Sequence, residues 1–360
     1  MTNSPNTFII AEAGVNHNGS IDLARSLIDA AVAAKADAVK FQSFVASSIV
    51  TTSARKAEYQ IAQTGGQESQ LEMLQRLELS HAQQRELFDY CKKSGIKFLS
   101  TPFDSESLKF LVSDLKLSTI KVGSGELTNA PFLLEVARCT DKLILSTGMS
   151  TIDEIELALG VVAFGMSANK TSEPSTDACK KALVNDAGKQ ALRQRVTLLH
   201  CTTDYPTSPA DINLRAMLTL SEKFNCQVGL SDHSVGTHIA VGAVAMGATV
   251  IEKHLTTSRD LAGPDHKASL EPDEFKKLVA NIRDIEIALG SAEKTPTANE
   301  TKNQQVARRS IVASKAIKSG EVFTTENIVV KRPGTGQSPF KYWDLLGTKS
   351  TRDIAANELI

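Results

Sequence analysis

The most regular feature of the sequence is a series of short, nearly continuous apolar runs, each followed by a longer stretch with the apolar spacing of an amphipathic helix. The eight runs are 8–12, 38–41, 97–101, 119–122, 143–146, 196–200, 228–232 and 249–254, and helical spacing is clearest in 21–34, 82–94, 105–115 and 152–162. Continuous apolar runs are typical of parallel strands buried on both faces. Eight strand-then-helix units predict an α/β fold, a (β/α)8 TIM barrel. A doubly wound sheet is the alternative, but the sequence carries no Gly-rich dinucleotide fingerprint to support it.

Two longer segments interrupt this repeat. Residues 47–79 follow the second predicted strand and are largely polar. On a barrel this loop lies at the catalytic rim, so we expect a lid over a substrate. Residues 167–195 are rich in Ser, Thr, Ala and Lys and lead into the sixth strand. That segment reaches its strand from the opposite rim, and we expect it to be remote from the chemistry.

The strand-then-helix repeat does not continue into the carboxyl-terminal part of the chain. A helical pattern at 272–289 is followed by a polar stretch with Pro296, and then by short strand-like pieces separated by glycine-containing turns. We therefore predict a catalytic barrel at 1–289, a linker at 290–305 and a small domain at 306–360. Roughly 55 residues give only a small core, so this domain is expected to pack on the barrel or on a partner chain.

Composition narrows the class of protein. Of the 360 residues, 41% are hydrophobic and 22% charged, which is typical of a globular protein. Lys and Arg number 40 against 41 Asp and Glu, so the net charge of −1 gives no field that would attract nucleic acid or an anionic membrane. Five cysteines without a CxxC pair favour reduced thiols. The polar start, Met1 to Thr7, lacks the pattern of a signal peptide, and 240–251 is too short to span a bilayer, so a cytoplasmic protein is expected.

A polar or ionisable side chain stands at the end of every predicted strand. In chain order these are Glu12, Lys40 with Gln42, Ser100 and Thr101, Lys121 with Ser124 and Glu126, Ser146 and Thr147, His200 with Thr202 and Thr203, Ser231 to His233, and Glu252 with His254. Barrel enzymes carry their active sites at this rim. Eight such endings in succession predict an active site.

One group of these residues consists of cations and hydroxyls. It comprises Lys40, Lys121, Thr101, Ser124, Ser146 and Ser231, with Gly123, Gly125 and Gly148 exposing backbone N–H groups. Charge-assisted donors of this kind suit a ligand that carries a phosphate and a carboxylate. The alternative is that the hydroxyls only cap the helices that follow the strands.

The second group contains two histidines that end neighbouring strands. His233 and His254 would lie side by side in a barrel, close to Glu12 and Asp265. Nitrogen and oxygen ligands of this type suit manganese, magnesium or zinc. The alternative is that each imidazole is a packed, hydrogen-bonded core residue. His200 stands within an apolar run and is interpreted as structural.

At this point the sequence resembles the sialic acid synthase family over essentially its full length. The stretches that carry the resemblance are 11–19 (AEAGVNHNG), 39–42 (VKFQ), 100–104 (STPFD), 121–126 (KVGSGE), 145–149 (LSTGM), 199–202 (LHCT), 229–233 (GLSDH), 251–254 (IEKH) and 263–265 (GPD). The tail resembles the family's antifreeze-like (SAF) domain through 307–310 (ARRS), 331–334 (KRPG) and 345–347 (LLG).

The resemblance implies an N-acetylneuraminate synthase, which condenses phosphoenolpyruvate with open-chain N-acetylmannosamine and water and releases phosphate. By position, the phosphoenolpyruvate site would comprise Lys40, Thr101, Lys121, Ser124, Ser146, Ser231 and Thr203, the last replacing an asparagine of some members. The aminosugar site would comprise Glu126, Tyr205, Asp265 and Arg332, the arginine coming from the other subunit of a domain-swapped homodimer. His233 and His254 would hold Mn²⁺ or Mg²⁺, with Glu12 near the reacting carbons.

Three other interpretations remain open at this stage. The same condensation on 2,4-diacetamido-2,4,6-trideoxymannose would make the chain an N,N'-diacetyllegionaminate synthase, and residues 42–44 and 56–60 occur with both specificities. A Schiff-base aldolase would use Lys121 or Lys40 as its nucleophile. A non-catalytic carbohydrate- or ice-binding protein is suggested only by the tail.

Overall fold

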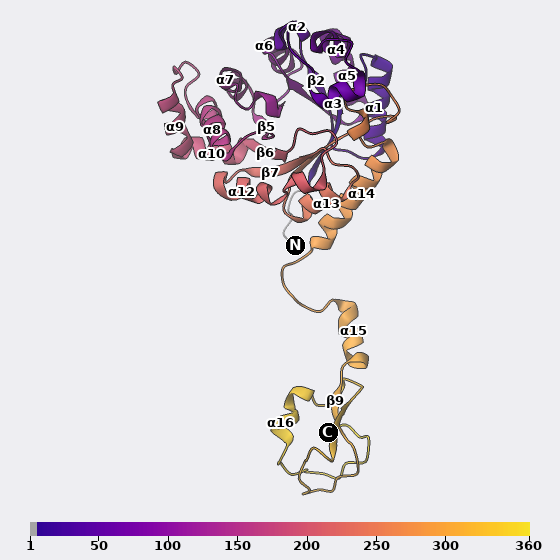
Figure 1. The fold of residues 1–360 in the computed structure, drawn as a ribbon. Helices are drawn as coiled ribbons and strands as arrows, with labels where there is room; N and C mark the ends of the chain where they lie inside the picture. Colours follow the sequence, from indigo (N-terminus) through magenta and orange to yellow (C-terminus); the bar gives the residue numbers. More distant parts are fainter. Residues whose placement is uncertain (1–5) are drawn as a thin grey trace. The chain divides into compact units, whose positions relative to one another are not determined.

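The computed structural model describes residues 6–360, and its amino-terminal part is a ring of eight parallel strands covered by helices (Figure 1). The strands are β1 (Phe8–Gly14), β2 (Ala38–Ser43), β3 (Lys97–Pro102), β4 (Thr119–Val122), β5 (Lys142–Ser146), β6 (Val196–Cys201), β7 (Gln227–Asp232) and β8 (Val250–His254). Their order is β3-β2-β1-β8-β7-β6-β5-β4, and the end strands β3 and β4 pack side by side. The predicted barrel is confirmed. Residues 1–5, part of the stretch inspected for a signal peptide, lie outside the described residues.

Helices connect the strands on the outside of the ring. They are α1 (Ile21–Ala33), α2 (Ala46–Ile49), α3 (Glu58–Thr64), α4 (Gln70–Leu77), α5 (His81–Ser94), α6 (Ser105–Lys109), α7 (Ala130–Cys139), α8 (Ile152–Ser167), α9 (Thr176–Val184), α10 (Asp186–Arg195), α11 (Pro209–Ile212), α12 (Arg215–Phe224), α13 (His238–Ala245) and α14 (Pro272–Leu289), with the short turns η1 (Phe110–Asp114), η2 (Ser124–Glu126) and η3 (His266–Ala268). Several begin at reciprocal caps, such as Ser80 with Gln83 and Thr151 with Glu154. The predicted helix at 105–115 is divided into α6 and a π-helical turn.

The inside of the barrel determines where the polar strand endings point. Its apolar plug consists of Ile10, Ala38, Leu99, Ile144, Leu199 and Val250. Side chains alternate along a strand, so the residues two positions further on point to the same interior. Those residues are Glu12, Lys40, Thr101, Ser146, Cys201 and Glu252. The plug therefore forms the base beneath a polar layer at the carboxyl ends of the strands.

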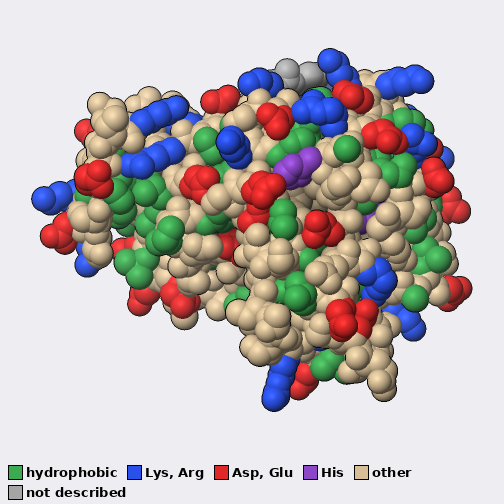
Figure 2. All heavy atoms as spheres, turned by 90° about the horizontal axis from the view of Figure 1, so that it is seen from above, with side chains coloured by type: hydrophobic (Ala, Val, Ile, Leu, Met, Phe, Trp, Pro, Cys, Tyr) green, Lys and Arg blue, Asp and Glu red, His purple; other side chains and the backbone are tan. Residues whose placement is uncertain are grey.

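The two interrupting segments are both helical. Residues 47–79 contain most of α2 together with α3 and α4. Residues 167–195 contain α9 and α10, which pack on α8. On the side where α8 and α9 lie in Figure 1, Figure 2 shows hydrophobic side chains at the surface, and Leu157 and Val184 are exposed.

The chain divides into two compact units between Gly290 and Ser291. The second unit contains α15 (Ala298–Ala307), β9 (Ser310–Ala313), β10 (Ile328–Lys331), η4 (Pro339–Lys341) and α16 (Tyr342–Leu345) around a small apolar core. Helix α15 occupies part of the stretch predicted as a linker, and it begins at a reciprocal cap between Thr297 and Glu300. All five cysteines lie in the described chain and are free thiols.

The distribution of charged side chains on the surface agrees with the net charge of −1. On the face seen in Figure 2, basic and acidic side chains are interspersed rather than gathered by sign. Between residues 6 and 360, none of the helices has both the length and the apolar character needed to cross a bilayer.

Candidate active site

A cavity of about 370 Å³ opens at the carboxyl ends of the barrel strands. It is lined by every barrel residue predicted for the site: Glu12, Lys40, Thr101, Lys121, Ser124, Glu126, Ser146, Thr203, Tyr205, Ser231, His233, His254 and Asp265. Arg332 belongs to the second unit, where its Nε donates to the carbonyl oxygen of Ala307 at 3.0 Å.

Two lysines and two carboxylates form the charged floor of this cavity, and each is at most 4% exposed. The Nζ atom of Lys40 lies 2.6 Å from Glu12 Oε2 and 3.7 Å from Glu252 Oε2. It also donates to the hydroxyl of Thr101 at 3.0 Å. The Nζ atom of Lys121 donates to Glu252 Oε1 at 3.1 Å. Each ammonium group therefore has a carboxylate partner within the floor.

The same environment shifts the two carboxylates in opposite directions. Burial raises the pKa of Glu12 to about 7, although the charge of Lys40 opposes it. Burial would also raise the pKa of Glu252, but the charges of Lys121 and Lys40 outweigh it and lower that pKa to about 2. For Lys40, burial would lower the pKa, and the charges of Glu12 and Glu252 raise it above the usual value instead. Glu252 is thus a firm anion, while Glu12 exchanges a proton near neutral pH.

The two histidines stand next to this floor with their rings 5.5 Å apart, measured between centroids. His233 Nδ1 donates to the carbonyl oxygen of Thr202 at 2.6 Å, which leaves Nε2 as the unprotonated nitrogen, 3.3 Å from Ser231 Oγ. Burial lowers the pKa of His233 to about 4. Burial together with the neighbouring His233 lowers the pKa of His254 well below its usual value. Both rings are neutral at pH 7, as metal ligation requires.

These residues fit a divalent metal ion. His254 Nδ1 is buried and receives no hydrogen bond from any residue in the range 6–360; Asp265 Oδ2 lies 3.9 Å away. Two imidazoles, with the carboxylate of Asp265 near His254, are nitrogen and oxygen donors of the kind that manganese or magnesium accepts. Among the described residues, no three His, Cys, Asp or Glu side chains converge as a complete ligand set. An ion held by the histidines would therefore take further ligands from water or substrate.

Neutral donors line the side of the cavity formed by β4, β5 and β6. The Ser124 hydroxyl accepts from the backbone N–H of Gly148 at 2.9 Å and lies 3.1 Å from Cys201 Sγ. A Cβ at position 148 would stand only 2.8 Å from Ser124 Oγ, so this close approach requires glycine. The buried hydroxyl of Ser146 has no protein partner within the described chain, which leaves it available to a ligand.

Aromatic rings also line the cavity. The ring of Tyr205 lies 4.2 Å from that of His233 and 4.9 Å from that of Tyr59, between centroids. Burial raises the pKa of the nearby Asp265 to about 6. Tyr59 comes from α3, so the segment predicted as a lid does line the cavity.

Glu252 and the residues of the 47–79 segment are absent from the predicted site. Glu252 was noted only as a strand ending, although it stands two positions before His254 and so faces the same interior. Nothing in the sequence indicates how 47–79 folds back over the rim. Two other histidines are structural: His200 pairs with the carbonyl oxygen of Ile212 at 2.6 Å, and His17 Nδ1 accepts from Gly19 N at 3.0 Å within the first loop.

Comparison with known families decides the assignment. The NeuB family matches residues 27–294, and the SAF domain matches residues 308–360. The chain belongs to the NeuB family. The predicted resemblance to sialic acid synthases and to their antifreeze-like domain is therefore confirmed.

Named relatives of this NeuB-family chain divide by product. The N,N'-diacetyllegionaminic acid synthase of Campylobacter jejuni is 47% identical over 98% of this chain and 98% of its own length. The enzyme of the same name from Legionella pneumophila is 41% identical over 97% of this chain and 92% of its own. The human N-acetylneuraminate-9-phosphate synthase is 32% identical over 98% of this chain and 91% of its own.

A solved structure of a sialic acid synthetase is also similar to this NeuB-family chain. The N-acetylneuraminic acid synthetase of Leptospira borgpetersenii, crystallised with citrate, aligns with a TM-score of 0.66 at 32% identity, over 83% of this chain and 90% of that one. The chain is an enzyme of the sialic acid synthase type, and the higher identities favour the diacetyllegionaminate interpretation over the N-acetylneuraminate interpretation.

Proposed function

We propose that this NeuB-family enzyme is an N,N'-diacetyllegionaminic acid synthase. It would join phosphoenolpyruvate to open-chain 2,4-diacetamido-2,4,6-trideoxymannose, consume one water, and release a nine-carbon 2-keto acid and phosphate. The observation that carries the proposal is the pair of relatives with this name, 47% and 41% identical across nearly the whole chain. N-acetylneuraminate, the product first expected from the sequence, is named for the 32% identical Leptospira synthetase, and the 32% identical human enzyme is named for its 9-phosphate.

The charged floor explains how phosphoenolpyruvate would bind. Its phosphate and carboxylate need several charge-assisted donors in a site shielded from water. Lys40 and Lys121 supply two, and the hydroxyls of Thr101, Ser124 and Ser146 lie along the same cavity. In the free enzyme Glu12 and Glu252 balance the lysine charges, so the ammonium groups stay buried without an uncompensated charge.

His233 and His254 would hold a Mn²⁺ or Mg²⁺ ion at the acceptor's end of the cavity. Such an ion, when bound, acts as a Lewis acid on a carbonyl oxygen. The rings are suited to this role because both are neutral and because the Thr202 carbonyl oxygen fixes the tautomer of His233.

The bond changes then follow from the substrates. The C3 carbon of phosphoenolpyruvate forms a bond to the aldehyde carbon of the acceptor, whose oxygen becomes an alkoxide, and positive charge develops at C2. Water adds at C2 and gives a proton to Glu12, which lies at the floor of the cavity. The adduct expels phosphate by breaking its C2–O bond, and the proton of the C2 hydroxyl leaves with the phosphate. The proton held by Glu12 neutralises the alkoxide, and the 2-keto acid remains. Lys40 and Lys121 stabilise the negative charge of the departing phosphate.

Isotope labelling tests this route. Phosphoenolpyruvate with ¹⁸O at the bridging position should transfer that oxygen to phosphate, and its recovery in the keto acid would disprove C–O cleavage.

Treatment with EDTA should remove activity, and Mn²⁺ or Mg²⁺ should restore it. Full activity after exhaustive chelation would refute the role given to His233 and His254.

The Schiff-base interpretation has little physical support. An aldolase lysine must lose its proton to attack a carbonyl, whereas the carboxylates beside Lys40 raise its pKa. Borohydride added with substrate should therefore leave the mass of the protein unchanged.

The assembly is part of the proposal as well. We infer a domain-swapped homodimer in the cytoplasm, in which Arg332 of each chain contacts the N-acetyl group of the acceptor bound by the other. The support is the SAF domain match at 308–360 and the small apolar core of that unit. A non-catalytic binding protein would not need the buried charges of the cavity floor.

A further inference from the structure

One wall of the cavity is apolar, and it comes almost entirely from the stretch between β2 and α5. Phe44, Met73 and Leu77 form its inner part and are each at most 4% exposed. Ile49, Val50 and Leu74 form its outer part, line the cavity and remain partly accessible. These six side chains together present an apolar surface to the cavity, and its outer part is the more accessible to solvent.

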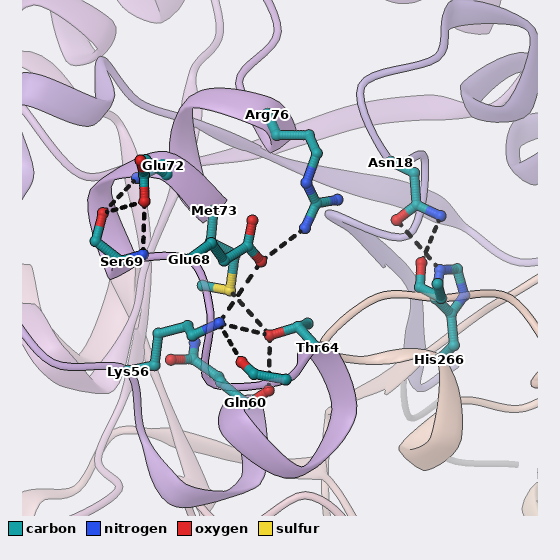
Figure 3. A network of polar contacts seen from close by, with 12 residues as sticks. Asn18, Lys56, Gln60, Thr64, Glu68, Ser69, Glu72, Met73, Arg76 and His266 are labelled. Carbon is teal, nitrogen blue, oxygen red and sulfur yellow. Dashed lines mark hydrogen bonds and ion pairs between the residues drawn. The ribbon is translucent and has the colours of Figure 1, made fainter.

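A network of polar contacts fixes the shape of this wall (Figure 3). The buried Lys56 donates to the hydroxyl of Thr64 at 3.0 Å and to the carbonyl oxygen of Gly65 at 2.6 Å. Its Nζ lies 3.6 Å from Glu68, which also accepts from Arg76 of α4 at 3.1 Å. Lys56 therefore ties the end of α3 to the connection that leads into α4.

The loop that follows β1 packs closely against the backbone of α4 at Arg76. A Cβ at Gly19, which has a φ of +77°, would stand 2.6 Å from the carbonyl oxygen of Arg76. The loop and the helix therefore approach more closely than any residue with a side chain allows. Asn18 on the same loop is hydrogen-bonded to the carbonyl oxygen of Ala262 at 2.9 Å.

The same stretch also offers amide and phenol groups to the cavity, namely Gln60, Gln70 and Tyr59. Alternating amide and hydrocarbon contacts match a sugar that carries acetamido groups and a terminal methyl group. In an extended acceptor the aldehyde carbon, C1, lies at the floor beside the histidines, and C6 lies at the far end of the carbon chain. The outer part of the wall is the part that C6 would meet.

We propose that Ile49, Val50 and Leu74 form a subsite for the C6 methyl group and select acceptors that lack a hydroxyl there. The inference rests on the proposed function, since it takes the open-chain aminosugar as the ligand. A hydroxyl pressed against Ile49, Val50 and Leu74 loses its hydrogen bonds to water and gains none from these three side chains, which penalises a 6-hydroxylated acceptor.

Four acceptors test the subsite and separate it from the proposed function. They are mannose derivatives with a 2-acetamido group, with or without a second acetamido group at C4, and with or without the hydroxyl at C6. The proposed function is tested by comparing acceptors with and without the acetamido group at C4. The subsite is tested by comparing acceptors with and without the hydroxyl at C6. We expect wild-type kcat/KM to favour each 6-deoxy acceptor over its 6-hydroxy partner by about 10- to 100-fold.

Two substitutions make the wall polar with little change of shape, Val50→Thr and Leu74→Asn. Each should reduce the C6 preference at least about 5-fold and leave the KM for phosphoenolpyruvate within about 2-fold, because a hydroxyl at C6 then finds a hydrogen-bond partner. The matched control is Leu71→Asn, on the same helix and in the same apolar cluster but outside the cavity lining, which should keep the wild-type preference.

Two results would overturn the subsite. One is a wild-type C6 preference near unity, and the other is a preference that Leu71→Asn reduces as much as Leu74→Asn does. A wild-type enzyme that needs no acetamido group at C4 would refute the proposed function, while the C6 comparison would still decide the subsite. No turnover of any of the four acceptors would refute both.

Discussion

Glu252 links both lysines on the floor of the cavity. It accepts from Lys121 at 3.1 Å and from the Ser231 hydroxyl at 2.8 Å, and it lies 3.7 Å from Lys40. Removing one partner of a buried ion pair leaves an uncompensated charge, which is more damaging than removing both. The contribution of the floor to stability and its contribution to binding can therefore be separated.

The substitution Lys121→Met should lower the free energy of unfolding by about 3 kcal/mol, because Glu252 loses a buried partner. Adding Glu252→Gln should recover at least half of that loss in urea unfolding. Activity should behave differently: kcat/KM should fall at least about 100-fold in both variants, since the proposed donor to phosphoenolpyruvate is absent. Lys142→Met, at the exposed start of β5, is the control. Recovery of activity together with stability would show that Lys121 is only structural.

The buried imidazole of His17 should make folding stability depend on pH in the acid range. Burial lowers its pKa from 6.5 to about 4, so the folded protein holds it neutral while the unfolded chain takes up a proton below about pH 6.5. Stability should therefore decline as the pH falls from 6.5 towards 4, by up to about 3 kcal/mol for this group. His17→Asn keeps an acceptor for the N–H of Gly19 but does not titrate. Urea unfolding at pH 7 and pH 4.5 should show a smaller decline in the variant, and an equal decline would contradict the assignment.

At the scale of the elements, the ends of β7 and β8 are joined behind the histidines. Lys253 is fully buried and donates to Asp232 Oδ2 at 2.8 Å and to the carbonyl oxygen of Ser234 at 2.5 Å. Asp232 and Lys253 are each the immediate neighbour of a histidine, and alternation directs them away from the cavity. This ion pair fixes the separation of the strand ends that carry His233 and His254.

Lys253→Met should therefore weaken metal binding although Lys253 does not face the cavity. Mn²⁺ should raise the melting temperature of the wild-type protein, because it binds only the folded state. We expect this rise to be at least halved in Lys253→Met and unchanged in Lys97→Met, a lysine exposed at the start of β3. An undiminished rise in Lys253→Met would show that the pair has no positioning role.

The elements differ in how far the sequence determines them. The bounds of the helix at 272–289 and of the eight strands agree with the prediction within one or two residues. The helix has a clear amphipathic spacing, and each strand is a short apolar run, so both can be recognised from local sequence. Helix α15 was missed, although Thr297 and Glu300 have the spacing of a reciprocal cap. The fold of 47–79 depends on Lys56, Glu68 and Arg76 meeting across a loop, which no local pattern reveals.

At the scale of the whole molecule, a net charge of −1 hides a concentrated arrangement of charge. The barrel places two lysines and two carboxylates at one end of its apolar plug, and the alternation of strand side chains explains why the residue types of the site could be predicted. Tyr59 and Gln60 could not, since they reach the cavity from a helix outside the periodic repeat.

The proposed domain-swapped homodimer can be tested with mixed subunits. Lys121→Met lacks a working barrel and Arg332→Ala lacks the arginine, so each homodimer should be nearly inactive. Subunits unfolded and refolded together should regain activity, because a hybrid pairs one intact barrel with an intact Arg332 from the other chain. Each variant refolded alone is the control. A mixture no more active than its components would show that Arg332 does not act across subunits.

The central claim concerns the acceptor, and internal competition tests it most directly. The enzyme would receive phosphoenolpyruvate, Mn²⁺ and equal concentrations of 2,4-diacetamido-2,4,6-trideoxymannose and N-acetylmannosamine, and mass spectrometry of the early products would give the ratio of the two kcat/KM values. We predict at least about a 10-fold excess of the diacetylated nine-carbon acid, in keeping with the effect of a single well-matched group on specificity. An excess of N-acetylneuraminate would contradict the account.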